Sequence, residues 1–177
     1  MVDWHAILEK HRGGMWRAVY RLLRNHDDAL ECCQDALLDA HQFTLKSTVT
    51  DFGPFLITLG TRRAIDRLRK QLSHRKFESS VEVVSEPADD INSPVQYALA
   101  NELFDRLRQK VSELPNKQAE AFWLTCIEGF SIEETSNLMF ITANEARVLV
   151  HRARGRLSIL LTPSDSTTRK SNETGPA

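Results

Sequence analysis

The feature that most constrains this chain is a long stretch without helix breakers: between Met15 and Phe52 there is no glycine and no proline. At its start, Met15, Val19 and Leu22 recur at the spacing of an amphipathic helix. The whole chain of 177 residues has 7 glycines and 6 prolines, about half the average usage. Because turn-rich β proteins depend on both residue types, the sequence predicts an all-α protein with long helices.

Helical spacing and helix-start signals place the expected elements. Gly13–Gly14 is expected to end a first helix that begins near Trp4, since glycine disfavours helix interiors. Asp28 precedes Glu31 by three residues, which resembles a capping box. The expected helices cover residues 4–13, 15–24, 28–43, 54–75, 96–113, 117–128, 132–139 and 143–161, with a loop at 44–51.

Charge is divided unevenly along the chain. The net charge is -1, yet residues 1–76 carry 13 Lys and Arg against 9 acids, and residues 77–100 carry 5 acids and no Lys or Arg. Polar composition and two prolines predict that the acidic stretch is mostly unstructured. We expect two small helical domains, at 1–76 and 96–162, joined by a flexible acidic linker at 77–95. A Ser/Thr-rich tail at 163–177 is expected to be disordered.

Two helix starts near the C-terminus predict a helix-turn-helix. Ser131 precedes Glu134, and Thr142 precedes Glu145, each by three residues, and the two starts are only eleven residues apart. On the second helix, Ala146, Leu149, Val150, Ala153 and Leu157 share the face expected to pack inward. The opposite face carries Asn144, Arg147, His151 and Arg154, which could read bases in a DNA major groove. Ordinary solvated charges are the alternative.

The helix expected at 54–75 has a strongly basic side. Arg62, Arg63 and Arg67 lie there, and Asp66 is the single acid between residues 62 and 76. Such clustering is typical of phosphate binding, although a solvated helix end would look similar. Asp66 is expected to pair with Arg62 or Lys70, four residues away on either side. The preceding loop carries Lys46, Ser47, Thr48 and Phe52, small polar groups beside an aromatic ring that could hold an unstacked base.

A leucine stands on the polar face of the helix expected at 28–43. Leu38 is surrounded there by carboxylates and amides, from Glu31, Gln34 and Asp35. A leucine ringed in this way resembles the centre of a docking patch for a basic protein surface. A stray surface leucine is the alternative.

The sequence offers no signature of catalysis or of a cofactor. Its three cysteines lack zinc-type spacing, and there is no nucleophile–base pattern or glycine-rich phosphate loop. We expect no enzyme activity, no metal, no cofactor and no small-molecule substrate. No apolar run approaches the roughly 20 residues of a membrane span, so we expect a cytoplasmic protein without membrane insertion.

Three stretches taken together resemble a known family. Residues 28–35 (DALECCQD) look like its "DAEDxxQ" segment, and residues 55–69 (FLITLGTRRAIDRLR) are similar to "WLxxIAxNxxxDxxR". Residues 114–122, 129–134 and 151–154 (LPNKQAEAF, GFSIEE, HRAR) look like "LPxxxREAF…GxSxxEIA…HRAR". In order and spacing the chain resembles the extracytoplasmic-function (ECF) sigma factors, the smallest two-domain sigma subunits of bacterial RNA polymerase.

The resemblance implies roles for the residues already singled out. The patch that would dock on bacterial RNA polymerase core comprises Asp28, Glu31, Gln34, Asp35 and Leu38. Binding to the melted minus-ten element of promoter DNA would fall to Lys46, Ser47, Thr48, Phe52, Arg62, Arg63 and Arg67. The minus-thirty-five element would be read by Asn144, Arg147, His151 and Arg154.

The chain departs from the family pattern at named positions. Arg62 stands where the family has Asn, Phe55 where it has Trp, and Glu145-Ala146 and Val148-Leu149 replace polar residues of the recognition helix. An anti-sigma factor is a possible further partner. Two other functions stay open at this point, a stand-alone helix-turn-helix regulator and a sigma-like decoy that binds polymerase or an anti-sigma factor.

Overall fold

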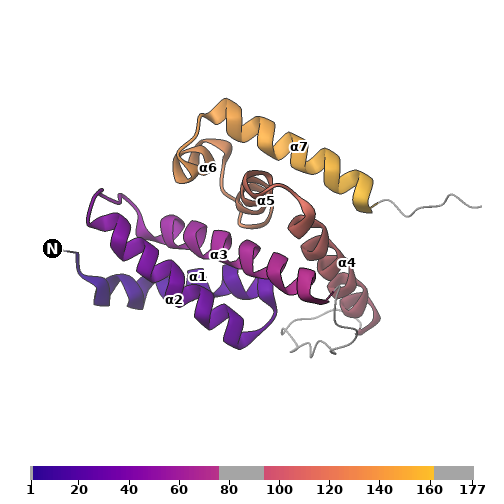
Figure 1. Cartoon of the computed structure of the whole chain (residues 1–177), viewed down its shortest axis with the longest axis horizontal. Coiled ribbons are helices and arrows are strands. Elements are labelled where there is room, and N and C mark those ends of the chain that lie inside the picture. The colour runs from indigo at the N-terminus through magenta and orange to yellow at the C-terminus, as the bar shows by residue number, and fades with distance from the viewer. Residues whose placement is uncertain (1, 76–93, 162–177) are drawn as a thin grey trace, which may run out of the picture.

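The computed structural model describes residues 2–75 and 94–161, and every regular element within them is helical (Figure 1). This confirms the all-α fold class. The tail expected at 163–177, and all but the last two residues of the expected linker, lie outside the described residues. The elements are α1 (Trp4–Leu23), α2 (His26–Thr44), α3 (Phe52–Arg75), α4 (Pro94–Glu113), α5 (Asn116–Phe122), a π-helical segment η1 (Trp123–Ile127), α6 (Ile132–Met139) and α7 (Ala143–Leu161). None of these helices has the length and apolar character needed to cross a membrane.

The N-terminal half is a bundle of α1, α2 and α3, with the closest packing between α1 and α3. Gly60 explains this approach, because a Cβ there would lie 2.7 Å from Val19 Cγ2 and 3.1 Å from Met15 Cγ. Met15, Val19 and Leu22 are buried against the other two helices. The absence of a side chain at Gly60 therefore allows α1 and α3 to pack closely.

The expected break at Gly13–Gly14 is wrong, since α1 runs unbroken from Trp4 to Leu23. Glycine inside a helix costs about 1 kcal/mol relative to alanine. Burial of Met15, Val19 and Leu22 on the same helix contributes roughly 1.5–3 kcal/mol for each large side chain. Tertiary packing therefore outweighs the local preference.

The start of α2 also differs from the expectation. The side chain of Asn25 accepts a hydrogen bond from Asp28 N at 3.0 Å, so the helix begins at His26, two residues before Asp28. Asn is a strong helix cap, and Asp28 becomes a residue of the first turn. The third helix likewise starts two residues early, at Phe52, where Asp51 Oδ1 accepts from Gly53 N at 2.9 Å.

The C-terminal half contains the expected helix-turn-helix. Ser131 and Glu134 form the full reciprocal capping box at the start of α6, while the Thr142 hydroxyl accepts from Glu145 N at 3.1 Å before α7. The helix expected at 117–128 is α5 followed by η1, where Glu128 N donates to Trp123 O, five residues back. Gly129 then turns the chain with φ +82°, a backbone conformation that favours glycine.

The two halves pack against each other rather than standing apart. Helix α3 contacts α4, α5 and α6 (Figure 1). One continuous core runs from Met15 and Leu22 in the N-terminal half to Val111, Leu114 and Trp123 in the C-terminal half. The sequence predicts two helical units, and the structure adds that they share a hydrophobic core.

Candidate nucleic-acid interface

Helix α7 presents the four expected base-reading side chains on its solvent side. Asn144, Arg147, His151 and Arg154 are all exposed, whereas Ala146, Val150, Ala153 and Leu157 are buried and Leu149 is half-buried. Two of these side chains, Arg147 and Arg154, also contact other groups of the protein. Arg147 Nη2 lies 3.9 Å from Glu133 Oε1, and Arg154 Nη2 donates to Cys126 Sγ at 3.2 Å.

Two further arginines of α7 are open to solvent. Helical periodicity places Arg152 and Arg156 nearer the inner face than Arg147 and Arg154, but in the structure both are exposed. The buried stripe of α7 is narrow because it is built mainly from alanine and valine. More of the helix surface is therefore cationic and open than periodicity predicts.

The turn between α6 and α7 is unusual. Phe140 ends α6 in the left-handed conformation, with φ 55° and ψ 45°, and 68% of its surface is exposed. A bulky side chain rarely adopts this conformation. Its ring centroid lies 5.6 Å from that of Phe43, at the end of α2. The helix-turn-helix turn thus contacts the end of α2, directly before the loop expected to hold unstacked bases.

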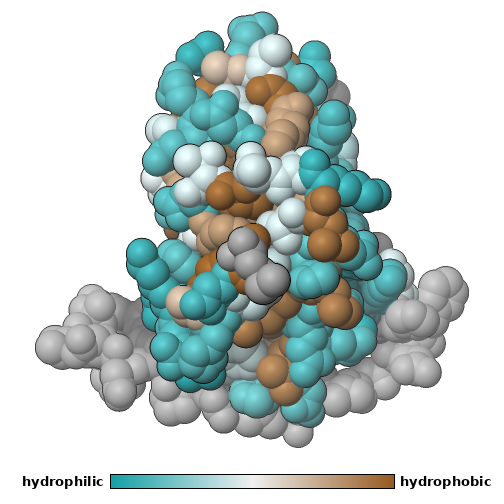
Figure 2. All heavy atoms as spheres, turned by 90° about the vertical axis from the view of Figure 1, so that its left-hand side faces the viewer, coloured by the Kyte–Doolittle hydropathy of each residue, from teal (hydrophilic) through white to brown (hydrophobic). Residues whose placement is uncertain are grey.

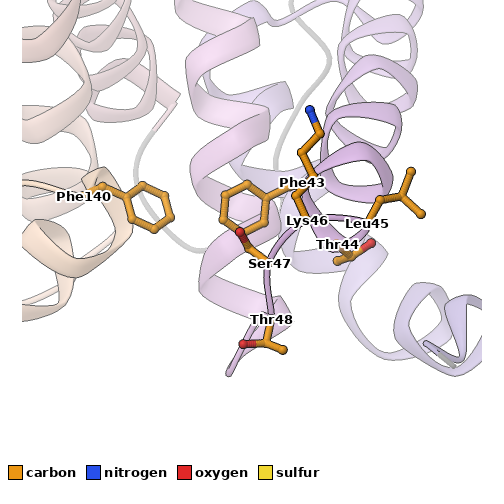
Figure 3. Close-up of a pocket in the computed structure, with 7 residues that line it drawn as sticks. All are labelled: Phe43, Thr44, Leu45, Lys46, Ser47, Thr48 and Phe140. Carbon is orange, nitrogen blue, oxygen red and sulfur yellow. The ribbon is translucent and has the colours of Figure 1, made fainter.

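That loop borders an open hollow of about 620 Å³, lined by Phe43, Thr44, Leu45, Lys46, Ser47, Thr48 and Phe140. Figure 3 shows the rings of Phe43 and Phe140 directed toward one another, with Ser47 beside Phe43. In Figure 2, hydrophobic surface gathers across the middle of this end of the molecule, between hydrophilic regions. Lys46, Ser47 and Thr48 are exposed and come together here, and Phe52 is half-buried in the first turn of α3.

The basic side of α3 is compensated by carboxylates. Arg62 Nη2 lies 2.7 Å from Glu120 Oε1 on α5, and Arg63 Nη2 lies 2.6 Å from Asp39 Oδ2 on α2. Arg67 Nη2 contacts Asp28 Oδ1 at 2.6 Å and Glu31 Oε2 at 2.7 Å. Hydrogen bonds to Asp39 and Asp28 raise the pKa of Arg63 and of Arg67, respectively. Part of the hydrogen-bonding capacity of each guanidinium group is therefore taken up by a carboxylate, and the rest stays open to a phosphate.

Two other charged groups of α3, Arg69 and Asp66, contact the C-terminal half. Arg69 donates to the carbonyl oxygens of Ser112 and Leu114, the first at 2.9 Å, and burial lowers its pKa. Asp66 accepts from Asn116 Nδ2 at 3.2 Å and lies 3.8 Å from Arg69 Nη1. The expected pairing of Asp66 with Arg62 or Lys70 is thus replaced by a contact with Arg69 on α3 itself and by a hydrogen bond from Asn116 in the other half.

The expected docking patch is divided by the structure. Leu38 is 62% exposed on α2 and Gln34 is exposed beside it, as expected. Asp28 and Glu31 lean toward α3 and hold Arg67, while Asp35 is half-buried. Leu30 is 45% exposed and extends the apolar part of this surface, although helical periodicity places it beside Ala29 and Cys33 on the inner face of α2. Cys32 takes its place in the core.

Sequence reasoning missed two residues that contact the proposed functional residues, Phe140 beside the hollow and Glu120 beneath Arg62. The position of Phe140 could not be predicted from the sequence, because Phe43, which it contacts, lies almost one hundred residues away in the chain. Glu120 is buried, with 8% of its side chain exposed. An acid among apolar residues of an amphipathic helix is a signal of a buried partner, but it does not say which cation. Among the described residues, no group of three His, Cys, Asp or Glu could hold a metal ion.

Two family models match the chain. "Sigma-70 region 2" covers residues 7–73 and "Sigma-70, region 4" covers residues 104–157. The chain is 26% identical over 171 residues to the ECF RNA polymerase sigma factor SigE of Mycolicibacterium smegmatis, with 97% of this chain and 66% of SigE aligned. It is 23% identical over 158 residues to SigW of Bacillus subtilis, with 85% of this chain and 84% of SigW aligned. The chain therefore spans just under two thirds of the length of SigE.

Two further similarities agree with these matches. The chain is 34% identical over 112 residues to the RNA polymerase sigma factor CarQ of Myxococcus xanthus, covering 63% of this chain and 62% of CarQ. The fold is similar to that of the sigma factor RpoE solved with the anti-sigma factor NepR from Bartonella quintana. That similarity has a TM-score of 0.55 and 21% identity, and it covers 92% of this chain and 98% of RpoE.

A helical region-2 bundle followed by a region-4 helix-turn-helix defines a sigma subunit of RNA polymerase. This chain belongs to the ECF sigma factors, which direct promoter recognition and transcription initiation.

Proposed function

We propose that each functional surface of the molecule has one partner: α2 docks on RNA polymerase core, the 45–51 loop with the start of α3 binds the minus-ten element, and α7 reads the minus-thirty-five element. The observation that carries the proposal is the exposure of Leu38, 62%, on a face that also bears carboxylates and an amide. A large apolar side chain at the centre of a polar rim is typical of an interface hot spot.

The polymerase contact is built on the acidic side of α2. Gln34 and Leu38 face solvent and supply direct contacts. Arg67 bridges Asp28 and Glu31, which fixes both carboxylates on the surface. We assign Asp28, Glu31, Gln34, Asp35 and Leu38 to the docking surface, with Arg67 also supporting it from α3.

The minus-ten contact combines a polar loop with cations on the following helix. Lys46, Ser47 and Thr48 are exposed at the hollow, where hydroxyl groups can hydrogen-bond to base edges. Aromatic rings nearby favour stacking of unpaired bases. Phe52, Arg62, Arg63 and Arg67 follow on α3, where the arginines can exchange a carboxylate for a DNA phosphate.

The minus-thirty-five contact uses the exposed face of α7. Arg147 and Arg154 can each make a bidentate contact to guanine, and Asn144 to adenine, if the N-terminal part of α7 lies in the major groove. His151 lies on the same face and adds a hydrogen-bonding group. The ion pair of Arg147 with Glu133 is long, 3.9 Å, and both side chains are largely exposed. Little free energy is therefore needed for Arg147 to leave Glu133 and bind DNA instead.

The work of the chain is binding rather than catalysis. Two weak DNA contacts held on one polymerase add through effective concentration, so neither unit needs high affinity alone. We place this activity in the cytoplasm, with polymerase core and promoter DNA. An anti-sigma factor is a further proposed partner, supported by the anti-sigma complex of the similar RpoE. A stand-alone regulator is disfavoured by the exposed Leu38 surface, which DNA binding does not require.

The test is binding of purified polymerase core to the Leu38→Arg variant. We expect affinity to fall by about 2 kcal/mol or more, the range of an interface hot spot, with an unchanged helical circular-dichroism spectrum because Leu38 is exposed. Leu45→Arg is the matched control: the residue type and added charge are the same and Leu45 is 72% exposed, just past α2. Equal affinity of wild type and Leu38→Arg contradicts the docking assignment.

A further inference from the structure

The first turn of α7 carries a carboxylate to which the proposed function gives no role. Glu145 directly follows Asn144, the first of the four proposed base-reading residues, and 45% of its side chain is exposed. Residues near the N-terminus of a recognition helix are those that reach base edges. A negative charge at this place calls for an explanation, because DNA phosphates repel it.

A capping role does not account for this carboxylate. At the start of α6, Glu134 Oε2 accepts from Ser131 N, 2.8 Å away, and so completes a reciprocal capping box. Glu145 has the same spacing from Thr142, whose hydroxyl accepts from Glu145 N at 3.1 Å. The carboxylate of Glu145, however, lies 3.6 Å from Lys117 Nζ on α5. The Glu145 side chain is thus directed toward α5 rather than back onto its own helix start.

Two loose ion pairs flank Asn144 on the exposed face of α7. Glu145 and Arg147 lie roughly 200° apart around the helix, at about 100° per residue. Glu145 faces α5 and Arg147 faces α6, and both of these helices pack against α7 (Figure 1). Their partners, Lys117 and Glu133, lie 3.6 and 3.9 Å away, and between 45% and 70% of each of the four side chains is exposed. Exposed ion pairs contribute little to stability, so both groups can turn from their partners to DNA.

The two sides of this face offer opposite hydrogen-bonding groups to the major groove. Arg147 only donates, and it suits the O6 and N7 acceptors of guanine. Glu145 only accepts, and it suits the N4 amine of cytosine. Guanine and thymine present oxygen acceptors in the groove, which leave a carboxylate unpaired, and adenine presents its amine beside the N7 acceptor. Glu145 is therefore suited to cytosine, and it rejects guanine and thymine.

We propose that Glu145 is a specificity-determining residue that selects cytosine at one position of the minus-thirty-five element. The inference rests on the proposed function of α7, since it requires this helix to lie in the major groove. When Glu145 turns to the base, the ammonium group of Lys117 is released beside the DNA. There it can bind a backbone phosphate and offset the charge of the carboxylate. The acid that weakens the general attraction to DNA thus gives selectivity at a single base pair.

The experiment selects promoter fragments with the full chain bound to core polymerase. A fragment that supports run-off transcription keeps its minus-ten element and start site, its minus-thirty-five region is randomised, and the bound fragments are sequenced. Glu145→Ala removes the carboxylate, and Glu145→Gln replaces it with an amide that pairs with adenine. Glu102→Gln is the matched control, because it removes an exposed acid from α4, outside the helix-turn-helix. Both sites are exposed, so the circular-dichroism spectra of all variants should match that of the wild type.

We expect cytosine to be enriched at one upstream position for the wild type and for Glu102→Gln. The enrichment over guanine and thymine should be about fivefold or more, the usual minimum for a mismatched base pair. Glu145→Ala should remove the preference at that position alone, and Glu145→Gln should shift it to adenine. Identical base preferences for wild type and Glu145→Ala overturn the inference, as does an equal loss of preference at every upstream position.

A further variant, Arg147→Ala combined with Arg154→Ala, separates this inference from the proposed function. If it removes upstream preferences while Glu145→Ala changes none, α7 reads the element and only the role of Glu145 is contradicted. If the wild type itself shows no upstream preference, the assignment of α7 to the minus-thirty-five element is contradicted, and the role of Glu145 with it.

Discussion

At the scale of single residues, charge is arranged in pairs that the linear sequence does not reveal. Helical periodicity alone predicts that Leu38 is exposed, because its neighbours on the face are polar. It also predicts the cationic side of α3. It cannot predict that Arg62 meets Glu120, which lies 58 residues further along the chain. Such partners depend on tertiary packing, so the basic patch looks freer in the sequence than it is in the structure.

The cysteines give a residue-scale prediction. Burial raises the pKa of Cys32 and of Cys33 to about 11, so at pH 8 only about one thiol in a thousand is ionised at each. Cys126 is half-buried. In the native chain we expect a disulfide reagent such as DTNB to modify one thiol quickly and the other two only on unfolding. The control is Cys126→Ser, which should remove the fast phase.

At high pH, the free energy of unfolding should depend on the ionisation of the same two thiols, Cys32 and Cys33. Their folded-state pKa values lie above the ordinary 9.0, so the unfolded chain ionises first as pH rises. The contribution of these two thiols to the free energy of unfolding should therefore be fully present below about pH 9 and be lost between pH 9 and 11. Rapid labelling of all three thiols in the folded protein would show that Cys32 and Cys33 are not buried as described.

At the scale of elements, the sequence predicts helix existence better than helix ends. The bounds of α6 and α7 are as predicted, because capping residues mark both starts. The predicted end at Gly13–Gly14 is wrong, because packing against α3 outweighs the preference of glycine. The start of α2 is shifted because Asn25, rather than Asp28, is the cap. Strong local signals thus succeed where no tertiary contact competes with them.

The close packing of α1 on α3 gives an element-scale prediction. Gly60→Ala places a Cβ 2.7 Å from Val19 Cγ2, so the Val19 side chain or the α1 backbone must shift. We expect a loss of roughly 1–3 kcal/mol in the free energy of unfolding, the usual cost of overpacking. Chemical denaturation followed by circular dichroism measures it.

Gly155→Ala is the matched control for that substitution. Gly155 is an exposed residue of α7, and a Cβ there meets nothing within 4 Å. Higher helix propensity should keep stability unchanged or raise it by up to about 1 kcal/mol. An equal change at both glycines would mean that α1 and α3 are not in the described contact.

At the scale of the whole molecule, the net charge of -1 conceals a division of labour. The N-terminal half is basic, residues 77–100 are acidic, and the remainder is balanced. Many of the cations of α3 are held by carboxylates of α2 and α5, so the free protein offers phosphate less charge than its composition suggests. Composition and motifs predict the two units and their surfaces. They could not predict the shared core, which depends on contacts between residues far apart in the chain.

The central claim is that this chain makes RNA polymerase start transcription at promoters that core enzyme alone ignores. Run-off transcription with bacterial core polymerase on genomic fragments, with and without the purified chain, tests it most directly. We expect discrete transcripts only when the chain is added, greatly reduced with Leu38→Arg and weakened when Arg147→Ala is combined with Arg154→Ala. Identical transcripts with and without the chain would contradict the account.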